Sequence, residues 1–188
     1  VSTGQIYSWL MDGATLIGER FLSEAQTTWR VAAVGDLNGD GKADLIWHHP
    51  DTGDLAVTLL DGFTTISHMP LNPGRLDTNW RLAGVADMNR DGREDLLWQN
   101  MTTGHLVYWL MDANNAVGSG LLSPGVTGTD WHIKALADFD LDGFPDIVWQ
   151  HASTNHLYVW FMAGTTLKSD RFLTPAFVGP GWEIVGGL

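Results

Sequence analysis

The sequence predicts an all-β fold, and three observations lead to this prediction. Marker residues recur every 51 residues along the 188-residue chain, which indicates a repeat protein. No window shows the sustained 3.6-residue hydrophobic period of an amphipathic helix. Each repeat divides instead into short apolar segments separated by turn residues such as Gly, Asp and Asn. Repeats of 40–50 residues with four strands each are typical of a β-propeller, which is the architecture that we expect.

The repeat is defined by four series of residues that share one spacing. Their agreement on a single period makes a chance coincidence negligible, and the comparison is made between copies within this one chain. The series are Trp29, Trp80, Trp131 and Trp182; Trp47, Trp98 and Trp149; Asp36, Asp87 and Asp138; and Trp9, Trp109 and Trp160, which Thr58 interrupts.

Four strands are expected in each copy. In the first complete copy, turn residues separate four apolar segments. These segments are residues 30–35, 45–49, 54–60 and 65–71. The central strands are apolar on both faces, so each sheet needs another sheet packed above and below it. A radial stack of blades provides this packing. A β-sandwich is the alternative, but it would leave one polar face on each strand.

The copies divide the chain into three complete blades and one split blade within a single propeller region, residues 1–188. The part missing from the split blade corresponds to residues 36–50 of the first copy. We favour a fragment of a longer propeller; alternatively, the ends share a blade within one chain or between two chains, which would give a homo-oligomer. The blades are residues 29–79, 80–130 and 131–181, with 1–28 supplying the last two strands and 182–188 the first strand of the split blade.

Composition argues against several classes of protein. Hydrophobic residues make up 44% of the chain, which is enough for a core, and the absence of Cys excludes disulfides and thiol chemistry. The formal net charge of -12 disfavours binding to nucleic acid or to anionic membranes. No apolar run approaches the ~18 residues that a membrane-spanning helix needs.

The acidic residues concentrate in three nine-residue loops, 36–44, 87–95 and 138–146, which hold 11 of the 22 acids. Loop positions 1, 3, 5, 6 and 9 are constant in kind. Oxygen side chains at 1, 3, 5 and 9, with the backbone carbonyl of position 7, suit the flexible oxygen shell of Ca²⁺. The candidate ligands are Asp36, Asn38, Asp40, Lys42 and Asp44; Asp87, Asn89, Asp91, Arg93 and Asp95; and Asp138, Asp140, Asp142, Phe144 and Asp146, where position 7 contributes its carbonyl.

These loops differ from an EF-hand, because position 12 is a Trp within an apolar strand instead of a bidentate Glu. The alternative to a metal site is a plain Asp/Asn/Gly turn. Zinc is disfavoured, since the loops contain neither Cys nor His. We expect about three structural Ca²⁺ ions per chain, which would stabilise the loops of a domain without disulfides.

Residues 34–44, 85–95 and 136–146 resemble the FG-GAP/VCBS-type repeat of integrin α-subunit propellers and of many secreted bacterial, fungal and lectin-like proteins. The resemblance covers essentially the whole chain. It implies a β-propeller with calcium in the loop between the first two strands of a blade, held by the constant loop residues named above. The Phe-Gly and Gly-Ala-Pro segments of the integrin version are absent, so integrin ligand binding does not carry over.

The sequence predicts a protein that is not an enzyme. It contains no nucleophile elbow, no zinc-protease motif and no phosphate-binding Gly loop. We expect a secreted or cell-surface recognition or adhesion module, of which lectin-like binding is one form, with glycans or cell-surface proteins as partners. The alternatives are a non-catalytic propeller attached to a secreted hydrolase, lyase or toxin, and a structural or oligomerisation scaffold.

Aromatic and polar residues suggest where ligands would bind. Burial is expected for six Trp residues, namely Trp47, Trp98, Trp149, Trp29, Trp80 and Trp131. Trp9, Trp109 and Trp160 are expected to be more exposed. The polar pairs after the second strand are the best candidates for a ligand-facing rim, and Asn100-Met101-Thr102 is an N-glycosylation sequon. These pairs are His48-His49, Gln99-Asn100 and Gln150-His151.

Overall fold

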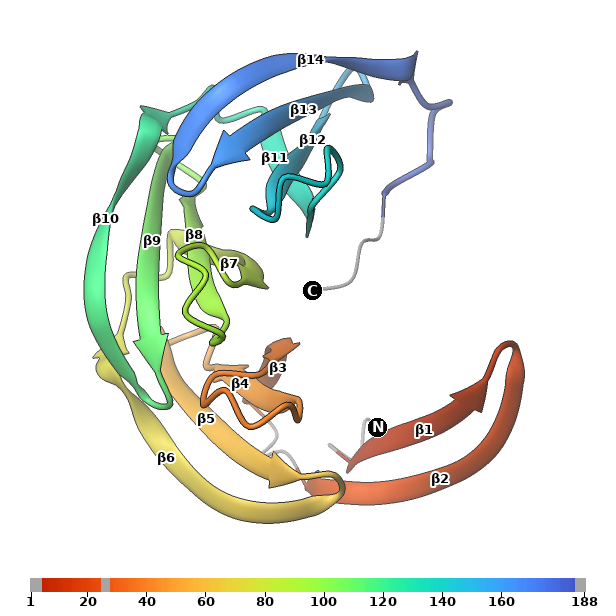
Figure 1. Cartoon of the computed structure of the whole chain (residues 1–188), viewed down its shortest axis with the longest axis vertical. Helices are drawn as coiled ribbons and strands as arrows, with labels where there is room; N and C mark the ends of the chain where they lie inside the picture. The colour runs from red at the N-terminus through yellow and green to blue at the C-terminus, as the bar shows by residue number, and fades with distance from the viewer. Residues whose placement is uncertain (1–4, 25–27, 185–188) are drawn as a thin grey trace.

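The computed structural model describes residues 5–24 and 28–184, in which all of the regular structure is β-strand (Figure 1). This confirms the predicted all-β class. The described residues contain no helix that could cross a lipid bilayer. The strands are β1 (Gln5–Asp12), β2 (Thr15–Glu24), β3 (Arg30–Gly35), β4 (Asp44–His48), β5 (Asp54–Asp61), β6 (Thr64–Arg75), β7 (Trp80–Ala86), β8 (Asp95–Asn100), β9 (His105–Asp112), β10 (Asn115–Val126), β11 (Trp131–Ala137), β12 (Asp146–His151), β13 (His156–Ala163) and β14 (Thr166–Phe177).

Each complete repeat folds into an antiparallel meander of four strands. Strands β3–β6, β7–β10 and β11–β14 pair in chain order, and β1 pairs with β2 as a separate hairpin. The third and fourth strands of each meander are joined by a tight turn. In the first repeat this turn contains Gly62 at φ 61°, a left-handed conformation that glycine adopts without strain.

The meanders follow one another along an arc, with β3, β7 and β11 on its inner side and β6, β10 and β14 on its outer side (Figure 1). At the outer side, neighbouring meanders are joined by backbone hydrogen bonds from Asn72 N to Asn114 O (2.7 Å) and from Ser123 N to Thr165 O (2.9 Å). Between the sheets, buried side chains of consecutive repeats share one core, so both faces of β8 are covered.

The Trp residues only partly follow the expected burial. Trp47, Trp98 and Trp149 are buried, which confirms the prediction for that series. The other residues predicted to be buried are only half-buried, namely Trp29, Trp80 and Trp131. The expectation of greater exposure is confirmed at Trp9 and wrong at Trp109 and Trp160. Their strands β9 and β13 lie inside the stack, where the two rings pack on Trp98 and Trp149 with centroids 5.2 and 4.9 Å apart.

The predicted ligand-facing rim is wrong for the three of its six residues that are buried, namely Gln99, Asn100 and Gln150, whereas its three histidines are half-buried. Two of the buried residues connect neighbouring repeats. The side chain of Gln99 donates to the carbonyl of Trp131 (2.5 Å) and accepts from the amide of Ile133 (3.3 Å). Gln99 and Gln150 are 2% and 4% exposed. Asn100 is also buried, and its Oδ1 accepts from backbone amides of the following turn.

Gln150 makes the same contact to the end of the described chain. Its side chain donates to the carbonyl of Trp182 (2.9 Å) and accepts from the amide of Ile184 (3.0 Å). Residues 182–184 therefore lie beside β12 as residues 131–133 lie beside β8. The rest of the predicted strand 182–188, and the predicted start of the split blade at residues 1–4, lie outside the described residues.

Candidate metal centre

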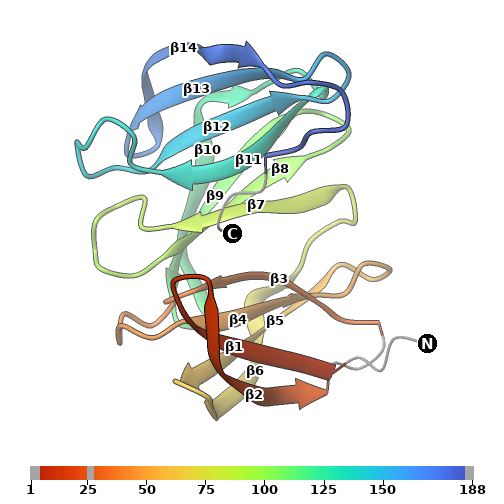
Figure 2. The ribbon, with the colours of Figure 1, turned by 90° about the vertical axis from the view of Figure 1, so that its right-hand side faces the viewer.

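The three acidic loops join the first and second strands of each sheet and project from the same side of the arc (Figure 2). Loop positions 1, 3 and 5 lie in the connection itself. Position 9 is the first residue of the second strand, namely Asp44 in β4, Asp95 in β8 and Asp146 in β12.

The carboxylate at position 1 organises the loop. In the first loop, Oδ1 of Asp36 accepts from the amides of Gly39 (2.7 Å) and Asp40 (3.1 Å), and Oδ2 accepts from the amide of Gly41 (2.7 Å). Gly41 has φ 80°, which explains why position 6 is glycine. The bonds to the amides of positions 5 and 6 recur in the other loops, between Asp87 and the amides of Asp91 and Gly92, and between Asp138 and those of Asp142 and Gly143.

Positions 3 and 5 continue this pattern of local hydrogen bonds. The Oδ1 atom of Asn38 accepts from the amide of Asp40, and Oδ1 of Asp40 accepts from the amide of Lys42, both at 2.9 Å. Such bonds from Asx side chains to nearby amides stabilise tight turns. The side chain of Lys42 itself turns to Asp61 (2.8 Å), outside the loop.

Position 9 has a structural role that the sequence interpretation missed. Asp95 is fully buried, and its two oxygens accept from the amides of Met88 in the loop and Met111 in β9, both at 2.9 Å. Asp44 and Asp146 make the equivalent pairs of bonds. The carboxylate therefore joins the loop to the third strand of its sheet. A constant Asp at the start of a buried strand was the available signal for this role.

Burial shifts the acidity of two of these carboxyls. Desolvation raises the pKa of Asp95 from 3.8 to about 6, although its two backbone hydrogen bonds oppose the shift, and the nearby Asp91 and Asp87 add to it. Desolvation likewise raises the pKa of Asp44. A cation beside these groups would offset this cost of burying negative charge.

The third loop brings its carboxylates together. Oxygen atoms of Asp138, Asp140 and Asp146 all lie within 4.8 Å of one another. Two oxygens that share one Ca²⁺ at 2.3–2.6 Å are separated by at most about 5 Å, so this donor set fits a calcium ion. Asn38 and Asn89 replace the acid at position 3 in the other two loops, where an amide oxygen would take its place.

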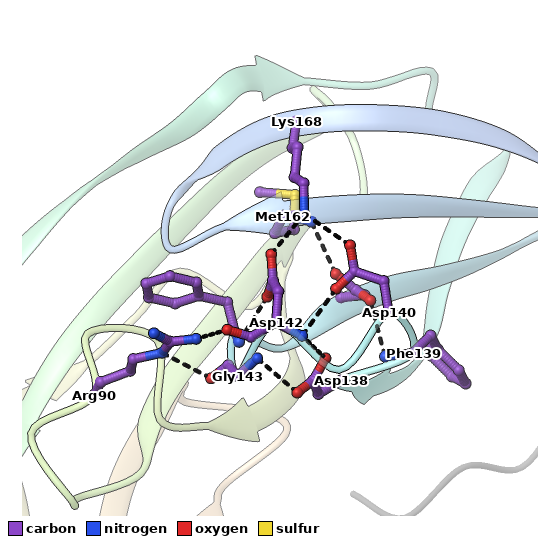
Figure 3. Close-up of polar contacts among 10 residues, drawn as sticks. Arg90, Asp138, Phe139, Asp140, Asp142, Gly143, Met162 and Lys168 are labelled. Carbon is purple, nitrogen blue, oxygen red and sulfur yellow. Dashed lines mark hydrogen bonds and ion pairs between the residues drawn. The ribbon is translucent and has the colours of Figure 1, made fainter.

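Lys168 of β14 also reaches this loop. Its ammonium group lies 2.9 Å from Oδ2 of Asp140 and 2.8 Å from Oδ2 of Asp142 (Figure 3). The two carboxylates raise the pKa of Lys168, and the ammonium lowers that of Asp142. The equivalent residues of the other repeats are Ile66 and Val117, so only the third repeat carries a cation at this position. A charged exception within an apolar series was the signal that could have identified Lys168.

Loops of neighbouring repeats contact each other. Oε2 of Glu94 accepts from the amide of Asp36 (2.6 Å), and the amide of Glu94 donates to the carbonyl of Asp36 (2.8 Å). The guanidinium of Arg90 donates to the carbonyls of Asp142 and Gly143 and lies 3.6 Å from the centre of the Phe144 ring. The three loops therefore form one continuous edge of the molecule.

Two family models match the chain. Residues 87–149 match the FG-GAP-like repeat, and residues 28–58 match the FG-GAP repeat. The shorter match contains the first acidic loop. The longer match begins at the first Asp of the second loop and also contains the third loop. No curated protein matches the chain significantly.

Proposed function

Because this chain is an FG-GAP-type repeat protein, we propose that it forms part of an extracellular, calcium-binding β-propeller that serves as a recognition or adhesion module. Repeats of this type suggest such a module. The observation that carries the calcium proposal is the gathering of three carboxylates of the third loop within 4.8 Å of one another. The same loop recurs in the other two repeats, so we extend the calcium proposal to those loops.

The propeller proposal is supported by the way the sheets stack. Four-stranded meanders with their first strands inside and their last strands outside are the units from which propellers are built. Gln99 and Gln150 hold each sheet to the next segment by the same pair of hydrogen bonds. The recurrence of this contact in two successive repeats supports a regular stack of blades.

Calcium would be held by side-chain oxygens of positions 1, 3, 5 and 9 and by the carbonyl of position 7. The ion would supply positive charge and would link the ligand residues of the loop to one another. It would take no part in a reaction on a substrate. The ion would offset repulsion among the acids of each loop, including the buried carboxylate that joins the loop to the third strand. We accordingly propose a non-catalytic protein whose partners are glycans or cell-surface proteins, outside the cell.

The third site would bind calcium more weakly than the other two. Lys168 neutralises Asp140 and Asp142, two of the proposed ligands, and must leave them when the ion enters. Lys42 and Arg93 form their ion pairs mainly with Asp61 and Asp112, acids outside the loops. Two stronger sites and one weaker site per chain are therefore expected.

Native mass spectrometry and thermal unfolding, each with calcium and with EDTA, test the proposal. With site dissociation constants of about 10⁻⁴–10⁻³ M, 10 mM calcium stabilises the fold by about 1.4–2.7 kcal/mol per occupied loop. We expect up to three ions per chain and a lower melting temperature in EDTA. Asp40→Ala should lower the melting temperature less than chelation does, because it affects one loop. Equal masses and melting temperatures in both solutions would refute calcium binding.

A further inference from the structure

A cavity of about 350 Å³ lies against the third sheet, beside the end of β10 and the first residues of its connection to β11. Its walls are largely aromatic. Tyr158 pairs with Phe172 across β13 and β14, and their ring centroids are 4.8 Å apart. The ring centroid of Trp131 lies 5.8 Å from that of Tyr158. Three aromatic rings from three different strands therefore face a common space.

One carboxylate completes the lining. Asp170 is exposed and paired in register with Trp160. Burial raises the pKa of Tyr158, and the carboxylate of Asp170 contributes to this shift. The lining includes no Lys, Arg or His, so nothing in the cavity wall neutralises Asp170. The hydroxyl of Thr127, which also lines the cavity, is buried and has no hydrogen-bond partner.

The residues that give the cavity its character are absent from the first and second repeats. Tyr158 corresponds to Val107 in the second repeat and Ala56 in the first; Asp170 corresponds to Ser119 and His68; Phe172 corresponds to Leu121 and Pro70. The β1–β2 hairpin carries the same arrangement: Trp9 is in register with Glu19, and the ring centroids of Tyr7 and Phe21 are 5.5 Å apart. The hairpin and the third repeat therefore share a unit of aromatic rings and one carboxylate, and in the third repeat this unit lines a cavity.

We propose that this cavity binds an organic ammonium ion, such as a trimethylammonium group, between the aromatic rings and Asp170. Aromatic faces attract cations through the ring quadrupole, also at partly exposed sites such as this one. The formal net charge of -12 adds a favourable long-range potential. A neutral sugar would need several hydrogen-bonding side chains around its ring, and this lining is mainly aromatic. The proposal does not depend on calcium binding.

The test is a calorimetric titration of the full chain with choline and with its uncharged isostere 3,3-dimethylbutan-1-ol. Choline should bind at least roughly tenfold more tightly, because the two probes share shape and differ in charge. Equal affinity for both probes would identify a merely apolar cavity and overturn the proposal. No binding of choline up to saturating concentrations would overturn it too. Binding of methyl glucoside in place of choline would assign the cavity to sugars.

Two variants that borrow residues from the second repeat locate the site. Asp170→Ser and Tyr158→Val should each weaken choline binding roughly tenfold or more, with unchanged β-sheet circular dichroism. Asp51→Ser removes an equal charge from an exposed turn remote in sequence, and should leave the affinity unchanged. If all three variants bind choline equally well, the cavity is not the site. The comparison of the two probes on the unmodified chain holds even if Tyr158→Val fails to fold.

Discussion

The second and third acidic loops share one pattern of residues but differ in how their charge is neutralised. In the second loop, Arg93 reaches Asp112 at the end of β9 and lies farther, at 3.7 Å, from Asp91 of its own loop. In the third loop, Lys168 lies within 3 Å of two carboxylates of the loop itself. The residues of the repeat pattern therefore determine the backbone of the loop, whereas a residue outside the pattern determines its charge.

Both loops have a buried Asp at position 9, and replacing this residue should have the largest effect on stability. Asp95→Ala removes the acceptor of two buried amides, those of Met88 and Met111. An unsatisfied buried amide costs about 1–3 kcal/mol, so we expect a loss of about 2–4 kcal/mol after relief from burying a carboxylate. Urea unfolding in EDTA measures this loss without any contribution from calcium. Asp146→Ala should cost a similar amount.

Asp91→Ala is the matched control within the same loop. Asp91 lies on the exposed part of the loop, so its removal should cost less than about 1 kcal/mol in EDTA. Equal losses for Asp91→Ala and Asp95→Ala would show that position 9 has no special structural role. A loss at Asp95 that disappears in EDTA would assign that role to the metal alone.

The acidity of the second loop predicts how the metal-free protein responds to pH. The pKa of Asp95 is raised from 3.8 to about 6 in the folded state. Between about pH 4 and pH 6 the folded state therefore binds more protons than the unfolded state, and stability falls as the pH rises. The raised pKa of Asp44 acts in the same direction. We expect the melting temperature in EDTA to decrease by several degrees as the pH rises from about 4 to about 6, because these two carboxyl groups lose their protons.

Calcium should reverse this trend, since it binds the ionised carboxylates and gains affinity as they lose protons. Melting curves between pH 4 and pH 7, with and without calcium, provide the measurement. Asp95→Asn serves as the control: its absolute stability is lower, but its metal-free pH slope between 4 and 6 should be shallower. An unchanged slope in Asp95→Asn would show that another group causes the effect.

The backbone pattern could be predicted from the sequence because the chain repeats it. The acidic loops fall between the first two strands of each sheet, where glycine at position 6 and Asx side chains favour a tight turn. Interactions between repeats were harder to predict, since they depend on which face of a strand meets the next sheet. Gln99 is polar and lies near the end of β8, which suggests exposure, yet it forms hydrogen bonds to β11.

Side-chain exposure and charge pairing follow from these contacts between sheets and strands. Trp109 and Trp160 belong to third strands, which appear peripheral when one sheet is considered alone, and the neighbouring sheet buries them. Lys168 follows its loop by more than twenty residues and reaches the acids only because β14 runs beside β13. Neither property is contained in the local pattern of a single repeat.

The smallest predicted effect isolates the difference between the two loops. Lys168→Met removes the ammonium that pairs with Asp140 and Asp142, so calcium would no longer have to displace it. We expect the third loop to bind calcium roughly three- to tenfold more tightly, because exposed ion pairs are individually weak. The amide resonances of Gly92 and Gly143, which donate to position 1 of their loops, report each site separately in a calcium titration followed by NMR.

In the unmodified chain, the Gly92 resonance should respond at lower calcium concentration than the Gly143 resonance, and Lys168→Met should bring the two midpoints together. Arg171→Met is the control for net charge, because Arg171 lies on the same strand over the Phe161 ring, away from the loop. If it tightened the third site as much as Lys168→Met, the effect would come from the overall field of the protein. Equal midpoints in the unmodified chain would contradict the comparison itself, since the ammonium would then present no barrier to the ion.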